Sequence, residues 1–138
     1  MSYSSFTIIG ENIHTTRVLR TDGKRVTKDE KGGEFVNYRD INGEISFMQI
    51  PDSFKETQVY QQGRVKHFMI AVTLGMSGSP EERTQGESYI LSEIKRQESK
   101  GSDFLDLNVD EISYKIDIQK SAIAWLLEFY SAKAKVPP

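Results

Sequence analysis

The chain has 138 residues, 37% of them hydrophobic and 28% charged, and its formal net charge is -2. This length suits one domain with its own core, and the near balance of charge argues against a strongly basic nucleic-acid binder or an acidic disordered chain. The sequence contains no cysteine, which excludes disulfides, thiolate nucleophiles and cysteine-based metal sites. No apolar run approaches the roughly 20 residues that cross a bilayer, and the N-terminus lacks the basic region of a signal peptide. We therefore expect a cytoplasmic protein with no membrane partner.

The first expected element is a buried strand over Phe6–Gly10, a β-branched run that ends at a glycine. Glu11, Asn12 and His14 follow it directly. Because α/β folds usually bind ligands at the carboxyl ends of such strands, these polar residues are candidate site residues. His14 is either an acid–base or ligand-contacting group or an ordinary surface histidine.

Residues 17–63 have a different texture, with short alternating segments and turn dipeptides that predict antiparallel hairpins. Asp22-Gly23 as a two-residue turn would place Leu19 opposite Val26. Asn42-Gly43 as a similar turn would place Tyr38 opposite Phe47 and Asp40 opposite Ile45, with Val36, Tyr38, Ile45 and Phe47 on one face. The segment 28–33 between the hairpins is expected to be a solvated loop.

The segment from Arg64 to Met76 fits either a helix or, in part, a strand. Ser79, Pro80 and two glutamates then predict the start of a helix that runs to Lys100 and stops at Gly101. A strand is expected over 103–109, and the clearest amphipathic helix over 116–132. Residues 135–138 resemble the opening of another strand.

The order helix, strand, helix and incipient strand is the rhythm of a βαβ unit, which builds doubly wound sheets and (β/α)8 barrels. A complete barrel needs about 250 residues, so this chain could supply only its first strands. We expect an α/β fold that is the N-terminal portion of a (β/α)8 barrel, with residues 17–63 as a β-hairpin insertion. The alternative is a small self-contained α/β domain.

Asp106 and Asn108 are the main candidates on the strand over 103–109, since their spacing of two puts both side chains on the same face. Polar side chains on a buried strand are costly unless a partner satisfies them. A ligand rich in N–H donors would suit them together with Glu11. The structural alternative is that Asp106 caps the next helix or pairs with a lysine. In the loop that follows, Asp110 and Glu111 could bind a ligand, while Asp110 or Ser113 could equally be a helix N-cap.

The remaining sequence patterns give weaker evidence for a functional site. No pair of histidines has metal-ligand spacing, so no metal site is expected. His67 is expected to be structural, and the glycines at 75 and 78 lack the lysine of a phosphate loop. A basic cluster of Arg17, Arg20, Lys24 and Arg25 is the whole basis for a nucleic-acid hypothesis and is expected to be merely solvated.

Two segments, 8–13 (Ile-Ile-Gly-Glu-Asn-Ile) and 101–111 (Gly-Ser-Asp-Phe-Leu-Asp-Leu-Asn-Val-Asp-Glu), resemble the first two strands of the pterin-binding barrel family. The nearest branch is the methyltetrahydrofolate:corrinoid methyltransferases, which include the folate domain of cobalamin-dependent methionine synthase. Residues 122–127 (Ala-Ile-Ala-Trp-Leu-Leu) are also similar to that branch. The likeness covers 6–16 and 85–138, and the Asp-Leu-Asn-Val-Asp-Glu string is its most specific part.

The resemblance implies a (β/α)8 barrel whose mouth binds the pterin ring through acidic and amide side chains. Glu11, Asn12, His14, Asp106 and Asn108 would be the pterin-binding residues, with Glu11 as a contact and Asp106 and Asn108 shaping the floor. The family usually has Gly-Glu-Arg-x-Asn after its first strand, whereas Asn12 and His14 stand here in place of the arginine and asparagine, which bears on how the substrate binds. The family's central aspartate would follow Val136-Pro137, beyond residue 138, and the 17–63 insertion has no counterpart in the branch.

The function that this resemblance implies is transfer of a methyl group from methyltetrahydrofolate, or use of a related pterin, with a corrinoid (cobalamin) on a partner as the acceptor. The protein would position two cofactors, and the insertion could dock a corrinoid carrier protein or domain. A homodimer is a further option. Alternatives are a dihydropteroate-synthase-like enzyme and a folate-binding module without catalysis, which the altered motif after the first strand suggests.

Overall fold

The computed structural model describes residues 9–14, 17–102, 104–109, 116–134 and 138. In chain order its elements are β1 (Ile9–His14), β2 (Leu19–Arg20), β3 (Val26–Lys28), β4 (Glu34–Arg39), β5 (Ile45–Gln49), α1 (Asp52–Lys55), α2 (Gln58–Gln61), β6 (Arg64–Val65), α3 (His67–Ser77), α4 (Pro80–Ser99), β7 (Phe104–Asn108) and α5 (Ile116–Lys133). The fold is mixed α/β. The part of the first predicted strand before Ile9, residues 110–115 and Val136-Pro137 lie outside the described residues.

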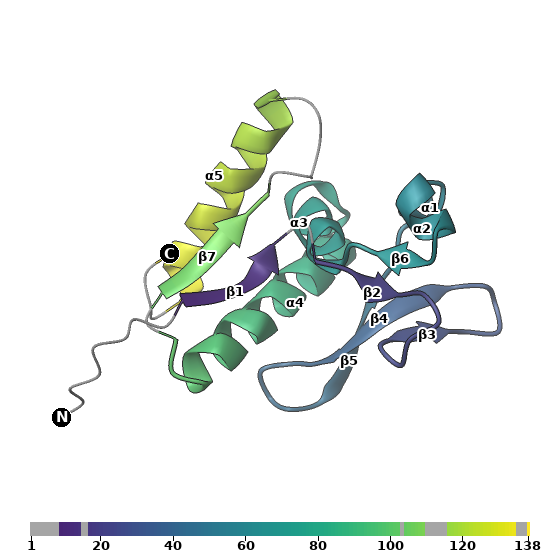
Figure 1. The fold of residues 1–138 in the computed structure, drawn as a ribbon, viewed down its shortest axis with the longest axis horizontal. Coiled ribbons are helices and arrows are strands. Elements are labelled where there is room, and N and C mark those ends of the chain that lie inside the picture. Colours follow the sequence, from purple (N-terminus) through teal and green to yellow (C-terminus); the bar gives the residue numbers. More distant parts are fainter. Residues whose placement is uncertain (1–8, 15–16, 103, 110–115, 135–137) are drawn as a thin grey trace.

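The strands β1 and β7 form a parallel pair. They are far apart in the sequence, since 89 residues lie between His14 at the end of β1 and Phe104 at the start of β7. Figure 1 shows this pair on one side of the molecule, with α4 and α5 beside it. Within the described residues it is the one parallel pair, so this part of the chain does not contain a closed barrel. The order β1, α4, β7, α5 is the one expected of consecutive βα units.

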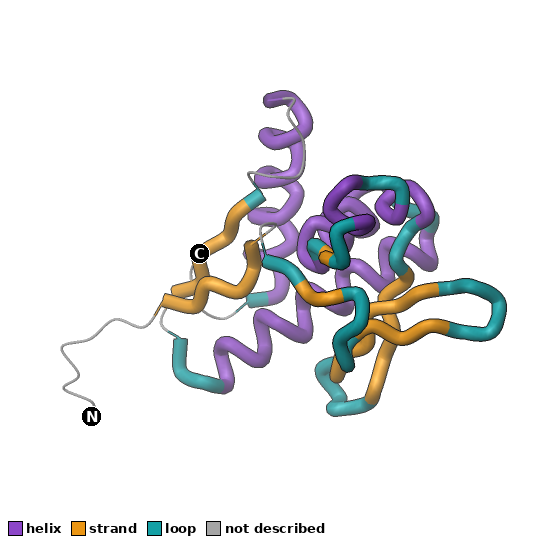
Figure 2. The backbone as a smooth tube through the Cα atoms, turned by 45° about the vertical axis from the view of Figure 1, so that its right-hand side comes forward, coloured by secondary structure: helices purple, strands orange, loops and turns teal. Residues whose placement is uncertain are grey.

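The rest of the strands make antiparallel sheets on the other side of the molecule (Figure 2). The strands β3, β4 and β5 form one sheet, so the predicted hairpin around Asn42-Gly43 exists. Its predicted register is wrong by one residue, because Tyr38 lies opposite Ser46 and Arg39 opposite Ile45. The loop is one residue longer than the predicted two-residue turn. The N–H of Asp40 donates to the carbonyl of Glu44 at 2.9 Å, so the loop between these two residues is 41–43.

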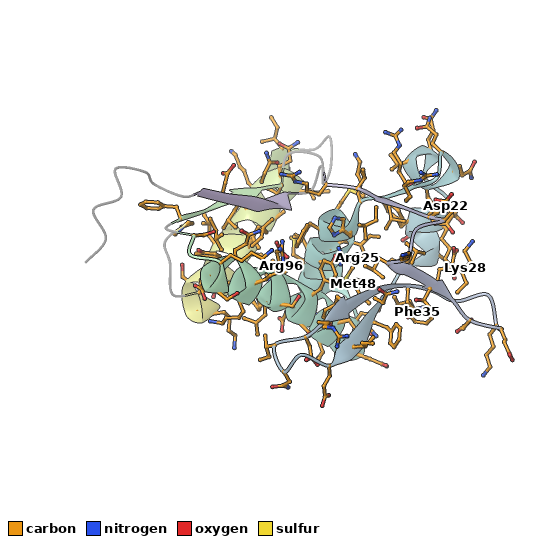
Figure 3. The ribbon with its side chains drawn as sticks, turned by 60° about the horizontal axis from the view of Figure 1, so that its bottom comes forward. Asp22, Arg25, Lys28, Phe35, Met48 and Arg96 are labelled. Atoms are coloured by element: carbon orange, nitrogen blue, oxygen red, sulfur yellow. The ribbon has the colours of Figure 1, made fainter. Side chains whose placement is uncertain are left out.

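This shift exchanges the two faces of the hairpin, as a one-residue slip must in a strand with period two. Val36 and Met48 are fully buried, whereas Ile45 and Phe47 are 60% and 48% exposed. Phe35 contacts Phe47 edge to face on the outer side, and Phe35 and Met48 lie on opposite faces of the sheet (Figure 3). The apolar face that the sequence predicted is therefore split between core and solvent.

The first predicted hairpin is wrong. Leu19 pairs with Val65 of β6, and Val26 pairs with Val36 of β4. A turn does form at Asp22-Gly23, since the N–H of Gly23 donates to the carbonyl of Arg20 at 3.0 Å. The two arms of this turn then separate into different sheets, because each arm finds an apolar partner elsewhere.

The helices α4 and α5 lie where the sequence predicts them, whereas the short helices α1 and α2 fall within the segment that was predicted to form hairpins. Ser79 accepts a hydrogen bond from the N–H of Glu82, whose carboxylate in turn accepts from the N–H of Ser79, and Pro80 opens α4. The ambiguous segment divides into the short strand β6 and the helix α3. The helix α5 matches the predicted amphipathic helix, with Ala122, Leu126 and Tyr130 buried. The predicted loop at 28–33 is confirmed as solvated.

The helices α3 and α4 cross at a glycine. A Cβ on Gly86 would lie 2.4 Å from the carbonyl oxygen of Ala71 and 2.9 Å from the backbone nitrogen of Gly75, both on α3. The two backbones can approach this closely because no side chain stands between them. The same helix α4 also contacts β1 and β5, so it joins the parallel pair to the antiparallel sheet.

Candidate functional site

The parallel pair brings the predicted site residues to one stretch of backbone. Gly10 lies opposite Leu105 and Ile13 opposite Leu107, with a register shift between them. Glu11 and Asn12 of β1 therefore stand across from the single residue Asp106 of β7, which is the arrangement of a β-bulge. Further along, His14 lies opposite Asn108. All five predicted residues thus fall within the stretch from Glu11 to His14 and the β7 residues opposite it, Asp106 to Asn108.

The strand β7 has one face toward the helices and one face away from them. Leu105 is 1% exposed, whereas its neighbour Phe104 is 41% exposed and Asp106 is also exposed. Because side chains alternate along a strand, Asp106 and Asn108 share the face of Phe104. Asp106 is accordingly exposed on that face, and a carboxylate can accept from a ligand with N–H donors.

Some of the predicted features lie outside the described part of the structure. These are the side chains of Glu11, Asn12 and His14, and the residues Asp110, Glu111 and Ser113. The register places the backbone of the first three.

A second feature is a cavity of about 680 Å³ between α4, the start of α3, the β4–β5 turn and the segment after β1. Its volume is typical of a site for a small organic ligand. The floor is formed by His67 and Phe68 of α3 with Tyr89 of α4, and Arg17, Arg25 and Arg96 lie around it. Figure 3 shows Arg25 and Arg96 near the middle of the molecule, between β1 above and the β4–β5 pair below.

The floor holds a short hydrogen-bonded chain of three side chains. Arg25 donates from Nη2 to the hydroxyl oxygen of Tyr89 at 2.8 Å, and that oxygen lies 2.5 Å from Nδ1 of His67. Tyr38 packs edge to face on Tyr89, with ring centroids 5.0 Å apart, and donates its hydroxyl to Ser88 at 2.9 Å. The three linked groups come from the turn before β3, from α3 and from α4.

The protonation states of His67 and Tyr89 follow from their burial and from the charges beside them. Burial lowers the pKa of His67 to about 3, the charges of Arg25 and Arg17 lower it as well, and Glu93 opposes them. Burial raises the pKa of Tyr89 to about 12, against the charge of Arg25. At neutral pH the imidazole is therefore neutral and the phenol is protonated. Arginine can only donate to the hydroxyl oxygen, and a hydroxyl proton given to Nδ1 leaves the imidazole with its own proton on Nε2.

Some residues of this cavity were named from the sequence, but not as members of one site. Arg17 and Arg25 belong to the basic cluster noted above, and His67 was expected to be structural. No local signal could have joined them to Tyr89, because Arg25 and Tyr89 are 64 positions apart and meet only in the folded chain. Burial of His67 at 7% exposure is in keeping with the structural reading of that residue.

Among the described residues, no group of three or more His, Asp or Glu side chains could hold a metal ion. None of the described helices is long and apolar enough to span a bilayer.

Comparisons of this chain with protein families, curated proteins and solved structures find no match.

Proposed function

We propose that the chain is the N-terminal portion of a pterin-binding (β/α)8 barrel that moves a methyl group from methyltetrahydrofolate to a corrinoid. The observation that carries the proposal is the bulged register, in which Glu11 and Asn12 stand opposite Asp106 and His14 opposite Asn108. Residues chosen from two distant segments for their resemblance to one family are thereby neighbours across a parallel pair. The succession β1, α4, β7, α5 supports the same reading.

The chemistry of the open face of β7 fits a pterin. The amino-pyrimidine edge of the ring presents N–H donors, and the exposed carboxylate of Asp106 is an acceptor beside the amide of Asn108, which can both donate and accept. These two side chains would orient the ring.

Methyl transfer from N5 breaks a carbon–nitrogen bond at a tertiary amine, which leaves readily only when its developing negative charge is relieved. The role of this chain would be to hold the ring so that a proton or a hydrogen bond reaches N5 in the transition state. A corrinoid, when bound on its carrier, supplies the cobalt nucleophile that accepts the methyl group. The carrier would dock at the insertion, whose outer face exposes Ile45 and Phe47.

The test is equilibrium dialysis of the full-length protein with methyltetrahydrofolate, followed by an assay of methyl transfer to cob(I)alamin. We expect saturable binding that Asp106→Asn weakens by about tenfold or more, as loss of a charged acceptor should. Asp117→Asn is the matched control, since Asp117 is an exposed carboxylate on α5.

The outcomes separate the alternatives. Binding without methyl transfer would favour the folate-binding module, and binding of an oxidised pterin in preference to the folate would favour the dihydropteroate-synthase-like enzyme. Absence of pterin binding in the full-length protein would overturn the proposal.

A further inference from the structure

The imidazole of His67 lies at the floor of the cavity beside α4. Its Nδ1 is engaged by Tyr89, and within the described part of the chain Nε2 has no hydrogen-bond partner. His67 is only 7% exposed, and it borders the cavity. Its second ring nitrogen can therefore bond to a ligand that enters the cavity.

Arg25 adds a positive charge beside this donor. It donates to the hydroxyl of Tyr89 at 2.8 Å and from Nε to the carbonyl of Asn37 at 3.4 Å, and no carboxylate of the described residues pairs with it. By contrast, Arg96 at the same cavity is already bound by Glu93, at 2.8 Å from Nε and 2.5 Å from Nη2. Arg39, which also borders the cavity, donates to the carbonyl of Gly43 at 2.8 Å. Arg25 is the arginine that joins the hydrogen-bonded chain of Tyr89 and His67 at the floor.

The walls around this polar floor are partly apolar. Val18 and Ile41 border the cavity, and they are 44% and 57% exposed. The rings of Phe68 and Tyr89 lie 5.3 Å apart at the floor. A volume of about 680 Å³ is also far larger than a simple inorganic ion requires.

We propose that this cavity binds a small organic anion, a carboxylate or phosphate monoester with an apolar body. The anionic oxygens accept from Nε2–H of His67 and from the guanidinium of Arg25, and the apolar body contacts Val18 and Ile41. Tyr89 is a positioning residue, since its hydroxyl holds the imidazole in the tautomer that donates into the cavity. This site goes beyond the pterin proposal, because none of the residues that it uses belongs to the β1–β7 pair.

The test is isothermal titration calorimetry of the chain with phenyl phosphate, benzoate and inorganic phosphate. We expect phenyl phosphate or benzoate to bind and Arg25→Gln to weaken that binding by about tenfold or more. Arg20→Gln is the matched control, because Arg20 is an exposed arginine that pairs with Asp22 outside the cavity.

A second measurement reports on His67 itself. The sequence has two histidines, so a His14→Gln variant assigns the ring resonances in a ¹H–¹⁵N spectrum. Saturation with phenyl phosphate should shift the Nε2 resonance of His67 and raise the pKa of its imidazole from about 3, because a bound anion stabilises the charged ring. A side chain with only a structural role would show neither change.

Three results would overturn the proposal. They are no binding of any of the three anions at millimolar concentration, equal weakening by Arg25→Gln and Arg20→Gln, or binding of inorganic phosphate as tight as that of phenyl phosphate. Failure of pterin binding would leave this proposal intact, since the two tests use different ligands and different residues.

Discussion

The hydroxyl of Tyr89 lies 2.5 Å from Nδ1 of His67, and both side chains are almost completely buried. The bond links α3 to α4, and Arg25 extends it to the sheet. Its loss would leave an imidazole nitrogen without a partner in the interior.

We expect Tyr89→Phe to lower the free energy of unfolding by about 1–3 kcal/mol, because it removes the hydroxyl from a buried hydrogen-bonded chain. Urea denaturation followed by circular dichroism measures the change. Tyr38→Phe is the comparison: its hydroxyl bonds Ser88 at a half-buried position, so the cost should be smaller. Equal costs for the two variants would contradict the role given to Tyr89.

The pH dependence of stability should carry the signature of His67. Its pKa is about 3 in the folded chain against an ordinary value of 6.5, so between these two values the unfolded chain binds a proton that the folded chain excludes. The free energy of unfolding should therefore fall as the pH drops from about 6.5 toward 3, by an amount on the order of a few kcal/mol. Denaturation at pH 7.0 and 4.5, with His67→Gln as the reference, measures it. A wild-type protein with the same pH slope as His67→Gln would rule this out.

At the crossing of α3 and α4, we expect the replacement of glycine by alanine to lower the stability of the protein, which is the opposite of its usual effect in a helix. In an ordinary helix Gly→Ala stabilises by about 0.5–1 kcal/mol. At Gly86 the added methyl would lie 2.4 Å from the carbonyl oxygen of Ala71, so Gly86→Ala should destabilise by about 1–3 kcal/mol. Thermal unfolding measures the sign, and Thr84→Ala on the exposed side of α4 should be close to neutral.

The register of the β4–β5 hairpin can be tested by truncation. Met48 is fully buried and Ile45 is 60% exposed. We expect Met48→Ala to cost about 2–5 kcal/mol and Ile45→Ala to change stability by less than about 1 kcal/mol. The register that the sequence predicted would give the opposite order, so the two variants distinguish them.

Local signals in the sequence were sufficient for the helices α4 and α5. Ser79, Pro80 and Glu82 define the start of α4 by hydrogen bonds within four residues, and Gly101 follows its end. The hairpin register was missed because Asn42-Gly43 forms the end of a longer loop. The carboxylate of Asp40 accepts from the N–H groups of Asn42 and Glu44, at 2.9 and 3.1 Å, and holds the additional residue in place.

The pairing of Leu19 with Val65 and the cavity at Tyr89 were missed for another reason. Both depend on contacts between segments more than 40 positions apart, which only the packed chain decides. The parity of Asp106 and Asn108 was predictable, because alternation within one strand is local. The bulge that sets Glu11 and Asn12 against Asp106 was not, since it arises from the pairing of two strands.

The helix α4 contacts β1 on one side and β5 on the other, and α3 crosses it at Gly86. If α4 separated from either the parallel pair or the antiparallel sheet, apolar side chains that it covers on both would become exposed. We expect the chain to melt in a single cooperative transition, with the amides of β1 and β5 exchanging their hydrogens at one common limiting rate. Occupancy of the cavity on α4 would then slow hydrogen exchange throughout the chain, including in strands that the ligand never touches.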